Sequence, residues 1–417
     1  MKKAELLSPA GNLEKLKIAL NFGADAVYGG VSHFSLRIRS GKEFTYESFK
    51  EGIEYAHSLN KKVYVTINGF PFNNQLNLLA KHIEKMRELN PDAFIVSTPG
   101  VIKLSKSIAS DIPLHLSTQA NVLNYLDAEV YYEMGVSRII AAREVSLKDL
   151  KEIKKHLPDL EIEVFVHGSM CFAYSGRCLI SSLQSGRVPN RGSCANDCRF
   201  PYTLYAHNEE SGVMMKIEEN ENGTFIMNAK DLNLSSYIDE ILQSKVIDSL
   251  KIEGRTKSPY YTGITTKTYK EAIDDFYNKR FKADKYYKEL LTTKHRGFSD
   301  GYLIHRPYEK LNDQKLDSSI SDGQMQVYAL VQENGDYFLA KDKVEPKIEY
   351  ELVYPSHFEI TLCDNETGSI LNKNGKYFIK LNKIETKNGK ILTAVHSGNE
   401  NPIKLPCKLP PFTFFRK

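Results

Sequence analysis

The sequence predicts an α/β protein: a (β/α)8 TIM-like barrel followed by a small antiparallel β-barrel domain. Eight short runs of β-branched and apolar residues alternate with amphipathic helical runs as far as residue 278, a spacing typical of parallel βαβ units. Beyond about residue 320, short alternating runs are separated by Asn-Gly and other glycine turns, which indicates antiparallel hairpins. The 417 residues, 41% of them hydrophobic, suffice for a large barrel with an appendage. A doubly wound parallel sheet is the alternative for the first part.

The βαβ units follow one another in order. In the first unit a strand is expected at 4–11, and the helical run 12–23 then places Leu16, Leu20 and Phe22 among charged residues. The expected strands are 4–11, 24–30, 61–69, 92–100, 112–120, 136–144, 160–169 and 249–255. The expected helices are 12–23, 44–60, 73–90, 100–111, 124–135, 146–159 and 258–278. Eight strands close a barrel of this type.

A ninth strand-like run, 224–232, exceeds the eight places of such a barrel. It follows a hairpin-like stretch, so we interpret it as part of an insertion. The predicted domains are 1–321, with a cysteine-rich loop at 168–200 and an inserted hairpin at about 201–224, and 322–417. A small β-barrel of this kind can grip nucleic acid or an oligomer partner, or can serve as a structural cap.

The composition of the chain predicts its cellular location and the kinds of partner it can bind. No apolar run reaches the roughly 18 residues of a membrane-spanning helix, and the start "MKKAELLSPAG" lacks the apolar centre of a secretory signal. We therefore expect a cytoplasmic protein with reduced thiols and no membrane association. A net charge of +4 permits an acidic partner such as RNA without requiring one.

Four of the six cysteines lie within 28 residues, as C-x6-C-x15-C-x3-C. They are Cys171, Cys178, Cys194 and Cys198, whereas Cys363 and Cys407 stand apart. In a reduced compartment such a group indicates ligands, and four cysteines are the usual ligands of an iron–sulfur cluster. Structural zinc is the main alternative, although the six-residue spacing does not suit it. The third alternative is that the four thiols bind no metal and only pack within the protein. The loop directly follows a strand, and such loops form the active face of a (β/α)8 barrel.

Polar residues at other strand ends are expected on the same face. Arg143 and Arg255 can hold a dianionic substrate through bidentate contacts. Alternatively, Arg143 and Glu253 form a buried pair that closes the barrel mouth. The candidates for proton transfer are His115, Glu144, Glu163, His167 and Asp231. Further candidates for substrate binding are Gln119, Lys251 and Glu253, with Asn68 and Ser117 beside them.

These residues also have structural interpretations. A lone histidine is more often a satisfied core residue than a catalyst, and Asp231 can simply cap a helix. Arg187 and Arg191, between the two cysteine pairs, can contact RNA or balance the charge of four thiolates.

The stretch "EVFVHGSMCFAYSGRCLISS" resembles the signature of the collagenase-like peptidases, the U-type family number thirty-two. The similarity continues through "SPAGNLEKLKIALNFGADAVYGG", "HLSTQANVLN", "RGSCANDCRFPY" and "LKIEGRTKSPYY", and covers residues 4–310. Within the family the chain is most similar to the tRNA 5-hydroxyuridine modification proteins. Other branches serve ribosomal RNA cytidine hydroxylation and oxygen-independent ubiquinone hydroxylation.

The resemblance implies hydroxylation of the wobble uridine of tRNA, with prephenate rather than dioxygen as co-substrate. It also implies a four-iron four-sulfur cluster on Cys171, Cys178, Cys194 and Cys198. The family name implies a peptidase instead, but the chain has neither H-E-x-x-H nor G-x-S-x-G, and a cysteine bound to iron is no nucleophile. A non-catalytic scaffold that carries a cluster is the third alternative.

Overall fold

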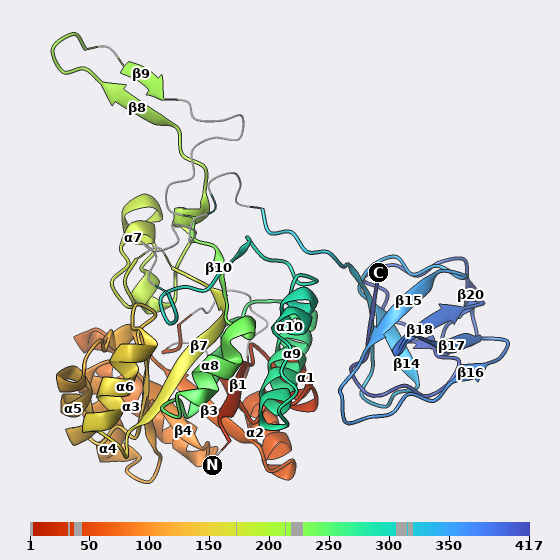
Figure 1. The fold of residues 1–417 in the computed structure, drawn as a ribbon, viewed down its shortest axis with the longest axis horizontal. Coiled ribbons are helices and arrows are strands. Elements are labelled where there is room, and N and C mark those ends of the chain that lie inside the picture. The colour runs from red at the N-terminus through yellow and green to blue at the C-terminus, as the bar shows by residue number, and fades with distance from the viewer. Residues whose placement is uncertain are drawn as a thin grey trace.

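The computed structural model describes residues 3–31, 34–36, 44–171, 173–212, 214–217, 228–305, 315 and 320–417. Figure 1 shows a barrel of strands inside a ring of helices, with a separate β unit beside it. Within the described residues, no helix combines the length and the apolar character needed to cross a bilayer.

Eight parallel strands form the closed barrel that the sequence predicts. They are β1 (Glu5–Pro9), β2 (Ala26–Gly29), β3 (Lys62–Ile67), β4 (Ala93–Val96), β5 (Leu114–Leu116), β6 (Arg138–Ile140), β7 (Glu161–Ser169) and β11 (Ser249–Ile252). Each pairs with its neighbour, and β11 closes the circle by pairing with both β1 and β7. This closure excludes the doubly wound sheet, which has open edges.

In the part of the chain that the structure describes, eight helices flank these strands on the outside. They are α1 (Leu13–Asn21), α2 (Tyr46–Ser58), α3 (Leu76–Glu88), α4 (Pro99–Ile108), α5 (Tyr125–Glu133), α6 (Leu147–His156), α8 (Ile238–Gln243) and α9 (Pro259–Tyr277). Side-chain caps fix several of their starts. Asn12 accepts from the Lys15 amide before α1, and Ser146 forms a reciprocal capping box with Asp149 before α6. A further helix, α10 (Ala283–Leu290), packs on α9.

Strand β7 is longer than its neighbours and carries a bulge. Lys251 lies opposite Phe165, but Ile252 lies opposite His167, so Val166 is an extra residue. An extra residue shifts the following side chains to the other face of the strand. Beyond the bulge, β7 also pairs antiparallel with β10 (Asp231–Asn233), which in turn pairs with β12 (Phe298–Ser299).

The inserted segment contains a hairpin of β8 (Leu204–His207) and β9 (Met214–Ile217). It extends away from the barrel on the side that carries the short helix α7 (Ile180–Ser185) (Figure 1). Of the strand-like run 224–232, residues 224–227 lie outside the described residues. The remainder includes the start of β10, which lies outside the eight-stranded barrel.

The C-terminal part folds as an antiparallel curled sheet. Its eight strands are β13 (Val327–Val331), β14 (Tyr337–Ala340), β15 (Glu349–Val353), β16 (Cys363–Asp364), β17 (Gly368–Lys373), β18 (Lys376–Leu381), β21 (Ile403–Lys404) and β22 (Phe414–Arg416). A two-stranded sheet, β19 (Ile384–Glu385) with β20 (Ile391–Leu392), completes it. Cys363 and Cys407 stand apart in the sequence, but their sulfur atoms lie 2.7 Å from each other here.

An apolar seam joins the curled sheet to the barrel. Phe414 of β22 contacts the rings of Phe22, which follows α1, and of Tyr260 in α9. Beside it, the buried Arg416 donates to Glu289 at 2.5 Å and to Glu351 at 2.8 Å. The sheet therefore packs on the flank of the barrel (Figure 1), beside α1 and α9.

Candidate active site and metal centre

The cysteine loop, residues 168–200, begins where β7 ends and contributes to a cavity of about 480 Å³. Cys171, Cys178, Cys194 and Cys198 all line this cavity. The barrel contributes Thr118, Gln119, Arg143 and Glu144 to the same lining. Because the carboxyl ends of the strands face this cavity, the cysteines lie over the end of the barrel where (β/α)8 enzymes carry their active sites.

Glu144 fastens the cysteine loop to the barrel. Its carboxylate accepts from the backbone amide of Ser175 at 2.8 Å and from the Ser175 hydroxyl at 3.2 Å. Asn121 also donates to it, at 3.4 Å. Gly176 has a φ of +74°, and a Cβ there would lie 2.2 Å from the carbonyl oxygen of Gln119. Only glycine therefore permits this approach. These contacts give Glu144 a positioning role, and the proton transfer that the sequence predicted for it stays a prediction.

The four thiols share one electrostatic environment. Cys171 is exposed and the other three are half-buried. Burial raises the pKa of the Cys178 and Cys198 thiols, and the neighbouring cysteines add to both shifts. Among the described residues, no three His, Cys, Asp or Glu side chains gather as tightly as a single metal ion requires. A four-iron cluster takes one cysteine per iron, so its ligands need not converge on one atom. The four thiols that line one cavity are therefore a donor set that fits such a cluster.

A smaller cavity of about 50 Å³ lies at the barrel mouth. Leu36, Thr118, Gln119 and Arg143 line both cavities, so the two are adjacent. The sequence-predicted residues that line the smaller cavity are Asn68, Ser117, Gln119, Arg143, Lys251, Glu253 and Arg255. The expectation that these strand-end residues meet at one face is therefore confirmed by their positions, while their roles stay predictions.

The two predicted anion-binding arginines differ in their contacts. The guanidinium carbon of Arg143 lies 4.0 Å from the centroid of the Phe165 ring, and Arg143 makes no ion pair with any residue that the structure describes. Arg255 instead donates to Ser35 at 2.7 Å and to Thr66 at 3.1 Å. Within the described residues, no hydrogen bond or ion pair joins Arg143 to Glu253, so the buried pair expected as the alternative is not found. Arg143 is thus the better placed cation for an anionic ligand.

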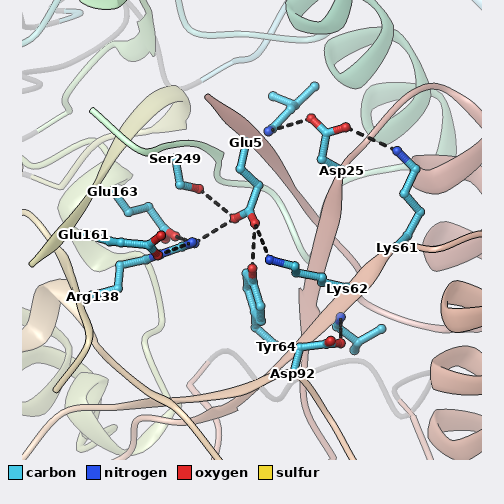
Figure 2. A network of polar contacts seen from close by, with 12 residues as sticks. Glu5, Asp25, Lys61, Lys62, Tyr64, Asp92, Arg138, Glu161, Glu163 and Ser249 are labelled. Atoms are coloured by element: carbon cyan, nitrogen blue, oxygen red, sulfur yellow. Dashed lines mark hydrogen bonds and ion pairs between the residues drawn. The ribbon is translucent and has the colours of Figure 1, made fainter. Parts of the chain in front are cut away.

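Glu163 lies deeper, in a network of charges that fills the other end of the barrel (Figure 2). It is fully buried and accepts from Lys251 at 2.8 Å and from Arg138 at 3.1 Å. Arg138 also pairs with Glu5 at 2.7 Å and Glu161 at 2.8 Å. Burial lowers the pKa of Arg138, but the carboxylates of Glu163 and Glu5 outweigh it and raise that pKa overall. Glu163 therefore acts as a buried counter-ion, and it lines neither cavity.

Neither candidate histidine lines the two cavities. His115 lies beneath the mouth, where its ring contacts Tyr64 at 4.7 Å; burial and then Arg138 hold its pKa well below the usual value. His167 packs outside the barrel against the rings of Tyr261 and Tyr269. Burial lowers the pKa of His167 to about 3, against the opposing charge of Asp231. The bulge at Val166 explains this position, because simple alternation predicts that His167 points inward.

Comparison with known proteins identifies the family. A sequence model described as Peptidase family U32 matches residues 11–313. The chain belongs to this family. In Helicobacter pylori (strain ATCC 700392 / 26695), "tRNA hydroxylation protein P" is 60% identical over the whole chain and 99% of its own length.

Two other U32 relatives carry different names. The "Collagenase" of Porphyromonas gingivalis (strain ATCC BAA-308 / W83) is 30% identical over 72% of this chain and 73% of its own. The "23S rRNA 5-hydroxycytidine C2501 synthase" of Escherichia coli (strain K12) is 32% identical over 67% of this chain and 40% of its own.

Sequence reasoning also missed a buried arginine, which lines neither cavity. Arg296, which is 2% exposed, donates to Asp231 at 2.5 Å and to the Ala229 carbonyl at 3.0 Å. Burial lowers the pKa of Arg296, while Asp231 and then the thiols of Cys198 and Cys171 oppose the shift. Asp231 therefore caps no helix but holds Arg296. No local pattern marks this arginine, because its partner lies 65 residues earlier.

Proposed function

We propose that this protein is an RNA-modifying enzyme that forms 5-hydroxyuridine at the wobble position of tRNA. In this proposal the four cysteines bind a four-iron four-sulfur cluster, and prephenate rather than dioxygen is the co-substrate. The observation that carries it is the arrangement of four thiols over the mouth of the barrel, in a chain 60% identical to a protein named for tRNA hydroxylation. Acting on tRNA implies a cytoplasmic location.

The chain's own residues suit such a reaction. A bound cluster would supply one-electron transfer at the wall of the larger cavity. Below it, Arg143 offers a planar guanidinium that can hold a carboxylate by two hydrogen bonds. Prephenate has two carboxylates, and Arg255 lines the same small cavity for the second. Gln119 lies at the junction of the two cavities and can fix the orientation of the ligand.

The larger cavity suits proteolysis poorly. A cysteine peptidase needs a thiolate beside a base that accepts its proton. Within the described residues the cavity is lined by four cysteines but by no histidine, and its one carboxylate, Glu144, accepts hydrogen bonds from Ser175. The peptidase reading is favoured only by the family's description and by the collagenase relative. Ribosomal RNA is a second candidate substrate, because a synthase of hydroxylated ribosomal cytidine is also related.

Nucleoside mass spectrometry of RNA from a deletion strain tests the proposal. Complementation with the wild type or with Cys363→Ser should restore 5-hydroxyuridine in tRNA, whereas Cys171→Ser should not. Restoration of a ribosomal hydroxycytidine alone would move the substrate to ribosomal RNA. If no hydroxylated nucleoside depends on the gene while the purified protein cleaves gelatin, the proposal fails and the peptidase reading replaces it.

A further inference from the structure

The cysteine loop concentrates the positive charge of the chain. Residues 168–200 contain four arginines and a single acidic residue, a net charge of +3 out of +4 for all 417 residues. The acidic residue, Asp197, is buried and accepts from Ser185 at 3.3 Å. Arg177 and Arg187 are exposed, and Arg199 is half-buried at the wall of the larger cavity. The surface of the loop is therefore cationic without exposed counter-charges in its described part.

Exposed aromatic side chains lie among these arginines. Tyr174 is 63% exposed and also lines the larger cavity, which places its ring at the rim. Phe200 is 52% exposed and directly follows Arg199, another residue of the lining. Tyr205, 53% exposed, continues the series into β8. Large aromatic side chains left in water beside a cavity indicate a surface that a partner covers.

The combination of charge and rings selects the kind of partner. An apolar protein surface would leave the arginines without counter-charges, whereas the phosphates of a nucleic acid provide them. Aromatic rings beside arginines are the usual platform for unpaired bases, because every base has a face that can stack. Base-modifying enzymes must also take their target out of its stack, and the loop of an RNA hairpin presents such bases readily.

We infer that Tyr174, Phe200 and the arginines Arg177 and Arg187 form the surface on which a single-stranded RNA loop docks. In this inference Tyr174 stacks on the base that enters the larger cavity, and Phe200 stacks on a neighbouring base. Arg177 and Arg187 hold the phosphates. The inference rests on the proposed function, since it places the RNA loop at the rim of the cavity where the base would react.

The test measures binding of a tRNA anticodon stem-loop to the full-length, iron-loaded protein, using Tyr174→Ala, Tyr174→Phe and Phe200→Ala. Each alanine variant should bind about ten-fold more weakly, while Tyr174→Phe, which keeps the ring, should bind like the wild type. The matched control is Tyr287→Ala, a 38% exposed tyrosine of α10 that lines neither cavity. Iron content and circular dichroism of each variant show whether the loop is still folded.

A second arm tests the charges. Replacing Arg177 and Arg187 together by Gln should weaken binding and flatten its dependence on salt. Wild-type affinity for the alanine variants and for this double variant, with iron retained, would overturn the docking inference. If wild-type protein still hydroxylates tRNA in that case, the proposed function survives. Affinity that does not respond to salt would assign the surface to a protein partner and equally overturn the inference.

Discussion

The two ends of the barrel interior are both rich in charged residues, but they use them differently. At the lower end, Arg138 contacts three carboxylates (Figure 2). Glu163 lies between Arg138 and Lys251. At the mouth, Arg143 lies against an aromatic ring and four thiols line an open cavity. Charges that satisfy one another close a barrel, whereas groups that lack such partners are available for a ligand. The comparison therefore separates structural residues from functional candidates.

The largest effect expected at the mouth is the loss of iron. Replacement of Cys171, Cys178, Cys194 or Cys198 by Ser removes one of four ligands, so each variant should lose most of its bound iron. Iron and acid-labile sulfide are measured after anaerobic purification. Cys363→Ser and Cys407→Ser are the matched controls, because these residues lie in the curled sheet. A similar iron content in all six variants would show that these four cysteines do not bind iron.

At the lower end, the expected effect is on stability. Arg138→Met leaves Glu5 and Glu163 without their arginine and should cost about 3–5 kcal/mol of unfolding free energy. Arg87→Met is the control, because Arg87 is about half exposed and pairs with Asp111 at the surface; it should cost at most about 1 kcal/mol. Urea denaturation of the two variants gives both numbers. A cost for Arg138→Met as small as that of the control would mean that the network contributes little.

His167 gives an intermediate effect that depends on pH. Its folded pKa of about 3 lies below the ordinary value of about 6.5, so the unfolded chain binds a proton that the folded chain does not. Above pH 6.5 the protonation of His167 takes nothing from the free energy of unfolding. As the pH falls from 6.5 toward 3, it lowers this free energy by about 1.4 kcal/mol per pH unit. We expect the unfolding free energy of the wild type to fall faster between pH 6.5 and 5 than that of His167→Gln. Parallel curves would show that His167 titrates normally, and would place it in contact with water.

The smallest effect concerns ligand recognition. Arg143→Lys keeps the charge but loses the planar donor pair, so the KM for a dicarboxylate co-substrate should rise about ten-fold. Its stability should change little, because Arg143 has no ion pair within the described residues. Arg87→Lys, at the surface, should leave the KM unchanged. Steady-state kinetics with varied prephenate distinguish the two variants, and an unchanged KM for Arg143→Lys would assign Arg143 to the structure.

The fold was predictable because each βαβ unit carries its own local signal. The eight barrel strands lie in the runs that the periodicity indicates, and the four cysteines are close in sequence. What could not be predicted depends on distant partners or on one extra residue. The bulge at Val166 turns His167 outward although strand alternation points it inward.

Long-range pairing explains the other differences. Asp231 meets Arg296 across 65 residues, Glu163 meets Lys251 across 88, and Cys363 meets Cys407 across 44. Residue types alone do not reveal these partners. A carboxylate on a strand looks the same in a sequence whether it faces a ligand or a buried arginine. The positions of strand ends were therefore predictable, whereas the division between counter-ion and ligand contact required the structure.

The most direct test of the central claim is an anaerobic reaction with purified, iron-loaded protein, prephenate and tRNA from a strain that lacks the gene. Mass spectrometry of the digested tRNA should detect 5-hydroxyuridine at the wobble position, in an amount that requires both prephenate and the four cysteines. The absence of any hydroxylated nucleoside from a reaction whose protein carries its full iron and binds tRNA would contradict the account.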